Sequence, residues 1–143
     1  MTPDDIIRHL DLRPHPEGGH FRQTWIAASD EGDSARAAGT SIYFLLKEGE
    51  TSHWHRVDAT EIWHYYSGAP LILSVSETEA GPARNLPLGP DLAKGALPQR
   101  IVPKHHWQAA RTTGAYTLVG CTVSPAFQFE GFELAPPGFD IPR

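Results

Sequence analysis

Three side chains that can bind a metal ion or move protons lie within nine residues of each other: His53, His55 and Glu61. The two histidines are two positions apart, so on an extended segment both project from the same face. A short polar turn over residues 56–60 can then fold the chain back and bring Glu61 beside them. Two imidazoles and a carboxylate on one wall suit a divalent transition metal, or a proton-transfer site that needs no metal.

A His-x-His pair on a strand can also be a half-exposed structural feature. The chain has eight histidines in 143 residues, so histidine pairs arise readily. The nearby Glu61 and the glycines at both ends of the stretch, Gly49 and Gly68, favour a functional role.

The stretch 49–68 resembles the first signature of the cupin superfamily, and Pro103-Lys-His-His-Trp-Gln108 resembles the second. Gln108 stands where that family carries its last ligand histidine, and His105 takes the usual glycine position, which places it in a turn. The resemblance implies a divalent metal, Zn, Ni, Fe or Mn, held by His53, His55, Glu61 and Gln108. Glutamine is a weaker ligand than imidazole for these metals, so the substitution disfavours metal binding.

A third block, residues 12–24, resembles the opening of one cupin branch, Cupin_5, whose members are described only as predicted sugar epimerases. Their fold is similar to that of dTDP-4-dehydrorhamnose 3,5-epimerase. Further blocks resembling that branch lie at 52–58, 61–64, 107–110 and 118–121. The resemblance implies one cupin domain over residues 1–143. Its fold would be all-β, a double-stranded β-helix (jelly-roll barrel) with a short N-terminal helix.

The expected strand 61–67 places Glu61, Trp63 and Tyr65 on one face. A carboxylate flanked by two flat rings suits a sugar-like ligand, although either ring can equally be core filling. On the first strand, Arg22 and Thr24 share a face. The Arg22 guanidinium can clamp a phosphate or carboxylate, or it can form a salt bridge with an acid. The substrate-binding candidates are therefore Glu17, which enters through the family-like block, with Arg22, Thr24, Trp63 and Gln108.

Three classes of function stay open. An epimerase or isomerase would use His53 or His55 as base beside Glu61, with Tyr65 or Tyr116 returning a proton from the other face. A metal-dependent oxygenase or lyase would use the metal set above. A small-ligand-binding cupin would catalyse nothing. The density of His, Glu and Tyr disfavours the third class, and the missing fourth histidine disfavours the second.

Composition and charge exclude other classes. A net charge of −5 argues against a nucleic-acid surface, and no apolar run is long enough to span a membrane. The N-terminus lacks a secretory pattern, and a single cysteine, Cys121, excludes an internal disulfide; both favour the cytoplasm. Cys121 lies in an apolar run and is expected to be a buried, inert thiol.

The elements that must position these residues are mostly strands. Thr2 and Pro3 begin a short helix that Pro14 prevents from continuing. The expected strands are 21–28, 40–47, 52–57, 61–67, 71–77, 99–102, 107–111, 116–123 and 131–134, with loops at 29–39 and 87–98. Such spacing without crossover helices indicates an antiparallel sandwich or barrel. Its unpaired edges and many aromatic residues predict a homodimer that pairs near residues 21–25.

Overall fold

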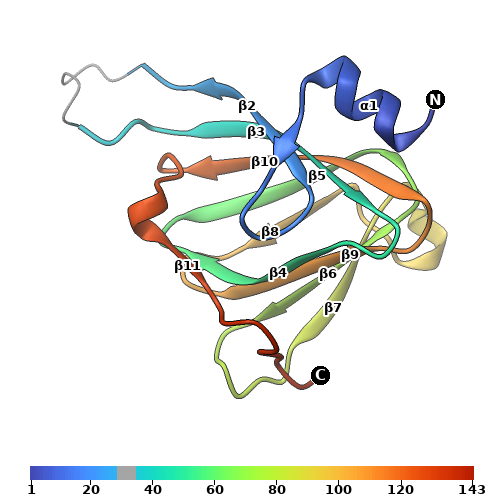
Figure 1. Cartoon of the computed structure of the whole chain (residues 1–143). Helices are drawn as coiled ribbons and strands as arrows, with labels where there is room; N and C mark the ends of the chain where they lie inside the picture. The colour runs from blue at the N-terminus through green and yellow to red at the C-terminus, as the bar shows by residue number, and fades with distance from the viewer. Residues whose placement is uncertain (29–34) are drawn as a thin grey trace.

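The computed structural model describes residues 1–28 and 35–143, so part of the loop expected at 29–39 lies outside the described residues. Figure 1 shows two layers of strands, with one helix at the upper edge. The elements are α1 (Pro3–Leu10), β1 (Arg13–Pro14), β2 (His20–Ile26), β3 (Thr40–Lys47), β4 (Thr51–Val57), β5 (Thr60–Gly68), β6 (Leu71–Ser76), β7 (Arg84–Leu88), η1 (Leu92–Lys94), β8 (Gln99–Val102), β9 (Trp107–Thr112), β10 (Tyr116–Ser124), η2 (Phe129–Gly131) and β11 (Phe132–Leu134).

The helix begins and ends as its sequence predicts. The Asp5 backbone N–H donates to the Thr2 hydroxyl and the Asp5 carboxylate accepts from the Thr2 N–H, which is a capping box with Pro3 at the first helical position. The helix ends at Leu10 because Asp11 turns into the left-handed conformation, ahead of Pro14. Its apolar side, with Ile6 buried, packs over Leu45 of β3.

All described strand pairs are antiparallel, in two sheets. The first has the order β1-β2-β3-β10-β5-β8, and the second has the order β11-β4-β9-β6-β7. The longest registers join β10 to β3 and to β5 on either side. Between the sheets lies an apolar core that includes Phe44, Trp63, Leu73 and Val119. The fold is the predicted all-β jelly roll with one short helix.

All nine segments predicted as extended contain strands, with ends displaced by at most a few residues. The structure adds β1 and β7, which the sequence analysis did not predict. Pro87 lies inside β7, at the edge of the second sheet, where proline is tolerated because one side of the strand needs no N–H donor. The predicted loop 87–98 therefore begins inside a strand, and it carries the short helix η1.

The turn before β2 packs closely on both sheets, and two glycines permit it. Gly18 and Gly19 have φ of 111° and 74°, a region that L side chains rarely adopt. A Cβ on Gly18 would overlap the carbonyl of Thr51, and a Cβ on Gly19 would lie 2.8 Å from the carbonyl oxygen of Leu45. Glycine thus allows residues 15–19 to reach between β3 and β4. Within the described part of the chain, no helix has the length and apolar character needed to cross a membrane.

Candidate functional site

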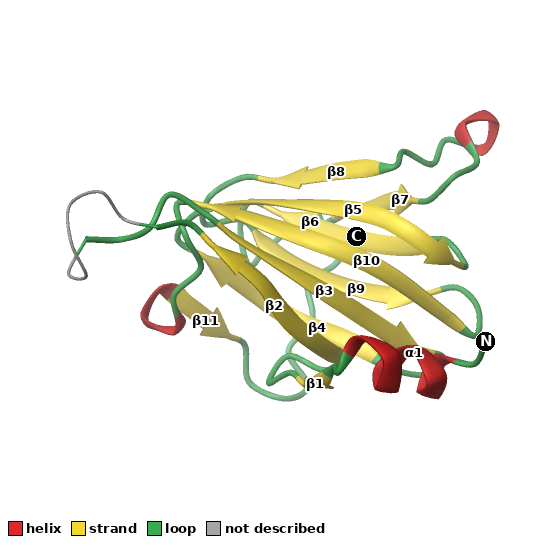
Figure 2. Cartoon of the chain, turned by 90° about the horizontal axis from the view of Figure 1, so that it is seen from above, coloured by secondary structure: helices red, strands yellow, loops and turns green. Residues whose placement is uncertain are grey.

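A cavity of about 60 Å³ opens between the two sheets, and Phe129 of η2 is among its lining residues. Figure 2 shows η2 beside β11, at one end of the barrel. It is lined by the turn before β2, by strands of both sheets and by the segment that follows β10. The lining residues are His15, Glu17, Phe21, Gln23, Thr40, Ile42, His55, Val57, Glu61, Cys121, Val123, Phe127, Phe129 and Phe132.

A buried carboxylate–imidazole pair forms the polar side of this cavity. Nδ1 of His55 lies 2.8 Å from Oε2 of Glu17 and 2.7 Å from the carbonyl oxygen of His53. Both neighbours are acceptors, so Nδ1 carries a proton. The Ser52 hydroxyl donates to the same Glu17 oxygen at 2.7 Å. These contacts orient the His55 ring and leave its Nε2 as the nitrogen that can act on a ligand.

Burial and charge act in opposite directions on the pair. Burial alone would lower the pKa of His55, but the charge of Glu17 and the hydrogen bond to it outweigh burial and raise that pKa to about 9. Burial alone would raise the pKa of Glu17, but the charge of His55 holds it below its usual value. At neutral pH the pair is therefore an imidazolium and a carboxylate.

Glu61 is a second carboxyl group with a different environment. Nε2 of Gln108 donates to its Oε1 at 2.9 Å, and Cys121 lines the cavity beside it. Burial raises the pKa of Glu61 to about 7, the nearby charge of His55 opposes this shift, and the charge of Glu17 adds to it. The pKa of Glu17 thus lies below the usual value of a glutamate, and the pKa of Glu61 lies above it. Carboxyl groups whose pKa values are separated in this way can take different roles in proton transfer.

His15 is a further titratable residue of the cavity, and the sequence analysis assigned it no role. The backbone N–H of Glu17 donates to Nδ1 of His15 at 3.1 Å, so Nδ1 is an acceptor and the ring proton lies on Nε2. Burial lowers the pKa of His15, which keeps the ring neutral at pH 7. Its presence in the block His15-Pro-Glu17 was the signal that could have identified it.

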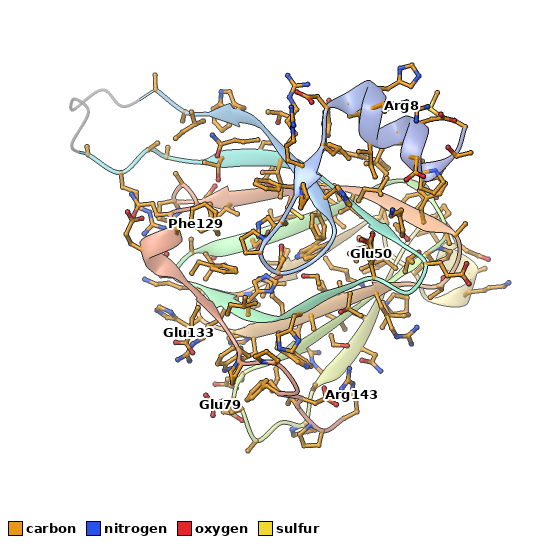
Figure 3. The ribbon with its side chains drawn as sticks, viewed as in Figure 1. Arg8, Glu50, Glu79, Phe129, Glu133 and Arg143 are labelled. Carbon is orange, nitrogen blue, oxygen red and sulfur yellow. The ribbon has the colours of Figure 1, made fainter. Side chains whose placement is uncertain are left out.

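Phenylalanine rings form much of the remaining wall. Phe127, Phe129 and Phe132 contact one another edge to face, with ring centroids 5.0–6.1 Å apart. Figure 3 labels Phe129 on η2, at the left-hand end of the molecule. Phe127 and Phe129 lie outside every predicted element and Phe132 lies in the predicted strand 131–134, so nothing in the sequence pattern indicated that these rings form a cavity wall.

The aromatic segment is held to the barrel by an ion pair. The Arg36 guanidinium donates to both oxygens of Asp58, at 2.8 and 3.0 Å, and to the carbonyl of Ala126 at 2.9 Å. A Cβ on Gly131 would overlap the Asp58 carboxylate, so the segment approaches the β4–β5 turn closely. Asp58 is therefore an anchor in that turn and no partner of a histidine.

The prediction that His53 and His55 share a face is wrong. Ser52 and His55 both contact Glu17 although they are three residues apart, because a bulge interrupts the pairing of β4 with β9. His53 lies instead in a separate outer pocket of about 200 Å³, where its Nε2 contacts the carbonyl oxygen of Pro136 at 3.0 Å.

The prediction that Trp63 and Tyr65 line the cavity is also wrong. Trp63 is buried in the main core, where its indole N–H donates to Oε1 of Gln108 at 2.8 Å. Tyr65 packs partly buried against the same core, and its hydroxyl donates to the carbonyl of Gly68. Alternation correctly placed both residues on the inner face with Glu61, but the cavity occupies only one end of that face.

Three further candidates lie away from the cavity. Arg22 donates to the carbonyl of Leu10 at the end of α1, and the Thr24 hydroxyl donates to the carbonyl of Ser41. Both are exposed and lie on the opposite face of β2 from Phe21 and Gln23. Tyr116 packs with the helix in a separate cluster.

Gln108 is buried behind the cavity, where it links Trp63 to Glu61. Of the sequence candidates, the structure brings Glu17, His55, Glu61 and Gln108 together.

The four residues implied for a metal do not fit one. His53 faces another pocket, and Gln108 already uses its amide oxygen for Trp63 and its amide nitrogen for Glu61. Across residues 1–28 and 35–143, no group of three or more His, Cys, Asp or Glu side chains is arranged to hold a metal ion. His105, with φ of 70°, lies in a turn as predicted.

Comparison with known proteins identifies relatives of the whole domain. Residues 4–135 match the family Cupin_5, described as Cupin superfamily (DUF985). The crystal structure of protein SO0799 from Shewanella oneidensis is 39% identical, with a TM-score of 0.88 over 94% of this chain and 85% of that chain. A hypothetical protein from Leishmania major is 31% identical, with a TM-score of 0.86 over 97% of this chain and 90% of its own.

More distant structures share the fold alone. A mutant of oxalate decarboxylase from Bacillus subtilis is 12% identical, with a TM-score of 0.62 over 86% of this chain and 29% of that one. The comparison with curated proteins gives no match. The family match spans nearly the whole chain, and two similar structures exceed 30% identity. The chain therefore belongs to the Cupin_5 (DUF985) family of the cupin superfamily.

Proposed function

We propose that this protein is an acid–base isomerase or epimerase that acts on a small carbonyl compound. The observation that carries the proposal is the buried Glu17–His55 contact of 2.8 Å, on the wall of a cavity that Glu61 also lines. A charged pair buried in this way is costly to the fold unless its partners are well satisfied, so its position in a cavity favours a functional role.

The two groups suit opposite proton transfers. Glu61, with a pKa of about 7, can remove a proton from the carbon next to the carbonyl. The electrons of the broken C–H bond form a C=C bond, and the carbonyl oxygen receives a proton from Nε2 of His55. Return of the proton from Glu61 to a different carbon gives an isomer, and protonation of the original carbon from its other face by solvent gives an epimer.

These roles differ from those predicted from the sequence. A histidine was expected to act as base, but the Glu17 carboxylate keeps His55 protonated at neutral pH, so His55 is the acid. Tyr65 and Tyr116 were expected to return the proton, but neither lines the cavity. Sugar derivatives remain substrates to test because of the resemblance to predicted sugar epimerases.

The proposal is tested by exchange of carbon-bound hydrogen with D₂O, followed by NMR over a panel of ketones and keto-sugar derivatives. We expect wild-type protein to catalyse exchange next to the carbonyl of at least one compound. The Glu61→Gln variant keeps the hydrogen bond from Gln108 but loses the base, so exchange should fall by roughly 100-fold or more.

A matched control is Glu133→Gln, since Glu133 is an exposed acid paired with Arg56 outside the cavity. It should leave exchange unchanged. Equal exchange by wild type and Glu61→Gln, with both folded, would overturn the assignment of the base. Absence of exchange over the whole panel would instead favour a cupin that binds ligands without catalysis.

A further inference from the structure

The cavity walls are strongly segregated by chemistry. Its buried polar groups, on His15, Glu17, His55 and Glu61, come from the turn before β2, from β4 and from β5. Elsewhere the lining is mostly carbon, contributed by Phe21, Ile42, Val57, Val123, Phe127, Phe129 and Phe132. The remaining lining residues are Thr40, whose hydroxyl accepts from the Phe127 N–H at 3.0 Å, the exposed Gln23, and Cys121 with its thiol.

This segregation disfavours a ligand with hydroxyl groups on every side. Each hydroxyl facing the phenylalanine walls would lose its hydrogen bonds to water and gain none from the protein. The aromatic-wall argument for a sugar also fails here, because Trp63 and Tyr65 belong to the core and do not line the cavity. The walls instead favour a ligand body made of carbon.

The size of the cavity limits that body. An ordered water needs roughly 10–15 Å³ of such space, so a cavity of about 60 Å³ has room for about four to six waters. An enclosed cavity that binds benzene measures roughly 150 Å³, so a ring here must extend into the open side of the cavity, where Phe129 is 57% exposed. The wall rings meet edge to face, and Phe21 meets the His15 ring in the same way, with centroids 4.5 Å apart. Such walls present both ring edges and ring faces, which favour a flat, unsaturated ligand.

His15 supplies a fixed donor on the polar side. Because its Nδ1 accepts the Glu17 N–H, its Nε2 carries the proton, and Nε2 makes no hydrogen bond within the described residues. His15 lines the cavity, where a ligand can meet its ring. His15 and His55 both line the cavity, and their ring centroids lie 6.1 and 5.4 Å from that of Phe132. A neutral imidazole N–H and an imidazolium that border the same space can both donate to one carbonyl oxygen.

Building on the proposed proton-transfer function, we infer that the substrate is a compact, planar carbonyl compound with an unsaturated carbon body. Its ring lies against Phe127, Phe129 and Phe132, and its carbonyl oxygen accepts a hydrogen bond from Nε2 of His15. His15 is thus a substrate-binding residue that selects for a carbonyl group.

Three probes of similar ring size separate the requirements of the cavity. Acetophenone has a flat ring and a carbonyl, toluene has the ring alone, and methyl glucoside is a polyol. Binding is followed by NMR chemical shifts and by the melting temperature. We expect acetophenone to shift signals of the three wall phenylalanines and to bind wild-type protein at least roughly tenfold more tightly than methyl glucoside.

The variant His15→Phe keeps a flat ring but removes the N–H donor. It should weaken acetophenone binding by roughly fivefold to tenfold and leave toluene binding unchanged. The control variant Ile101→Ala, on the exposed edge strand β8, should change neither. If His15→Phe does not fold, the wild-type comparison of the three probes still decides the ligand class.

The inference is overturned if methyl glucoside binds in the cavity as tightly as acetophenone, or if His15→Phe weakens acetophenone and toluene equally. Its failure is distinguishable from failure of the proposed function. Exchange on a keto-sugar with no acetophenone binding would refute the ligand class and keep the proton transfer. Acetophenone bound in the cavity without exchange of its methyl hydrogens would support the ligand class and count against the proton transfer.

Discussion

Glu17 determines the charge state of the cavity because its carboxylate is the charged group that contacts Nδ1 of His55, at 2.8 Å. Its Oε2 accepts from both Nδ1 of His55 and the Ser52 hydroxyl. Without Glu17, the imidazolium would keep only the partial charge of the His53 carbonyl and the weaker influence of Glu61. The ion pair is therefore the feature of the site most sensitive to a single substitution.

The raised pKa of His55 predicts how stability changes with pH. The folded-state pKa is about 9, against a usual value of 6.5, so the folded protein holds this proton more tightly than the unfolded chain. This contribution is complete below pH 6.5 and is lost as pH rises to about 9. We expect the free energy of unfolding to decline across that range, measured by denaturant titration.

The variant Glu17→Gln tests the cause of this decline. Removing the carboxylate charge leaves burial as the main influence, so the pKa of His55 should fall and the decline between pH 6.5 and 9 should disappear. NMR titration of His55 measures the shift directly. The substitution Glu133→Gln, at an exposed acid outside the cavity, is the control and should preserve both the pKa of His55 and the decline in stability. If the stability of Glu17→Gln depends on pH in the same way as that of wild type, the ion pair between Glu17 and His55 is refuted as the cause of the decline.

The same two groups predict a bell-shaped pH dependence of catalysis. Glu61 must lose its proton to act as base, with a pKa of about 7, and His55 must keep its proton to act as acid, with a pKa of about 9. Exchange rates should therefore rise through pH 7 and fall above pH 9. In Glu17→Gln, the fall in exchange rate at high pH should begin at a lower pH than in wild type. An unchanged position of this fall would argue against His55 as the acid.

At the scale of elements, the turn before β2 is the part of the fold that builds the site. It brings His15 and Glu17 between the sheets, and the backbone N–H of His53 donates to the carbonyl of Glu17 at 2.8 Å. Gly18 can make this approach because it has no Cβ to meet Thr51.

We expect Gly18→Ala to destabilise the protein by at least about 1–3 kcal/mol, since it adds steric overlap to a strained backbone angle. Gly49→Ala is the matched control: its φ is 83°, but nothing lies within 4 Å of the added Cβ. Gly49→Ala should lower the free energy of unfolding only by the cost of the backbone strain. Thermal and denaturant unfolding measure the stability of both variants. Equal losses of stability would show that the close approach of Gly18 to Thr51 is unimportant.

At the scale of the whole molecule, the first sheet leaves an apolar edge uncovered. β1 pairs with β2 only at Phe21 and His20, and beyond them Trp25 and Ile26 are 55% and 54% exposed. An unpaired strand edge with exposed apolar side chains favours association with another strand. We propose that two copies of the chain pair through β2.

Light scattering at micromolar concentration should then give twice the 15.7 kDa mass of one chain. Trp25→Glu should shift the mass toward the monomer, because it places a charge at the pairing edge. Ile101→Glu, on β8 at the opposite edge of the same sheet, is the control and should remain dimeric. A wild-type mass of 15.7 kDa would contradict the proposal.

Local pattern was sufficient for the helix, for nine of the eleven described strands and for the family. The capping residues of α1, the alternation along β5 and the motif blocks depend on neighbours within a few positions, so the sequence shows them directly. The same blocks identified Glu17, His55, Glu61 and Gln108, which the structure does bring together.

Only the tertiary structure decided which side chains meet in the cavity. A bulge in β4 separates His53 from His55, because strand pairing inserts a residue that no local pattern marks. The cavity sits at one end of the barrel, so Trp63 and Tyr65 fill the core while His15 and phenylalanines more than 100 residues later form the walls. Sequence determines local conformation through adjacent residues, whereas contacts between distant strands depend on register and closure of the whole barrel.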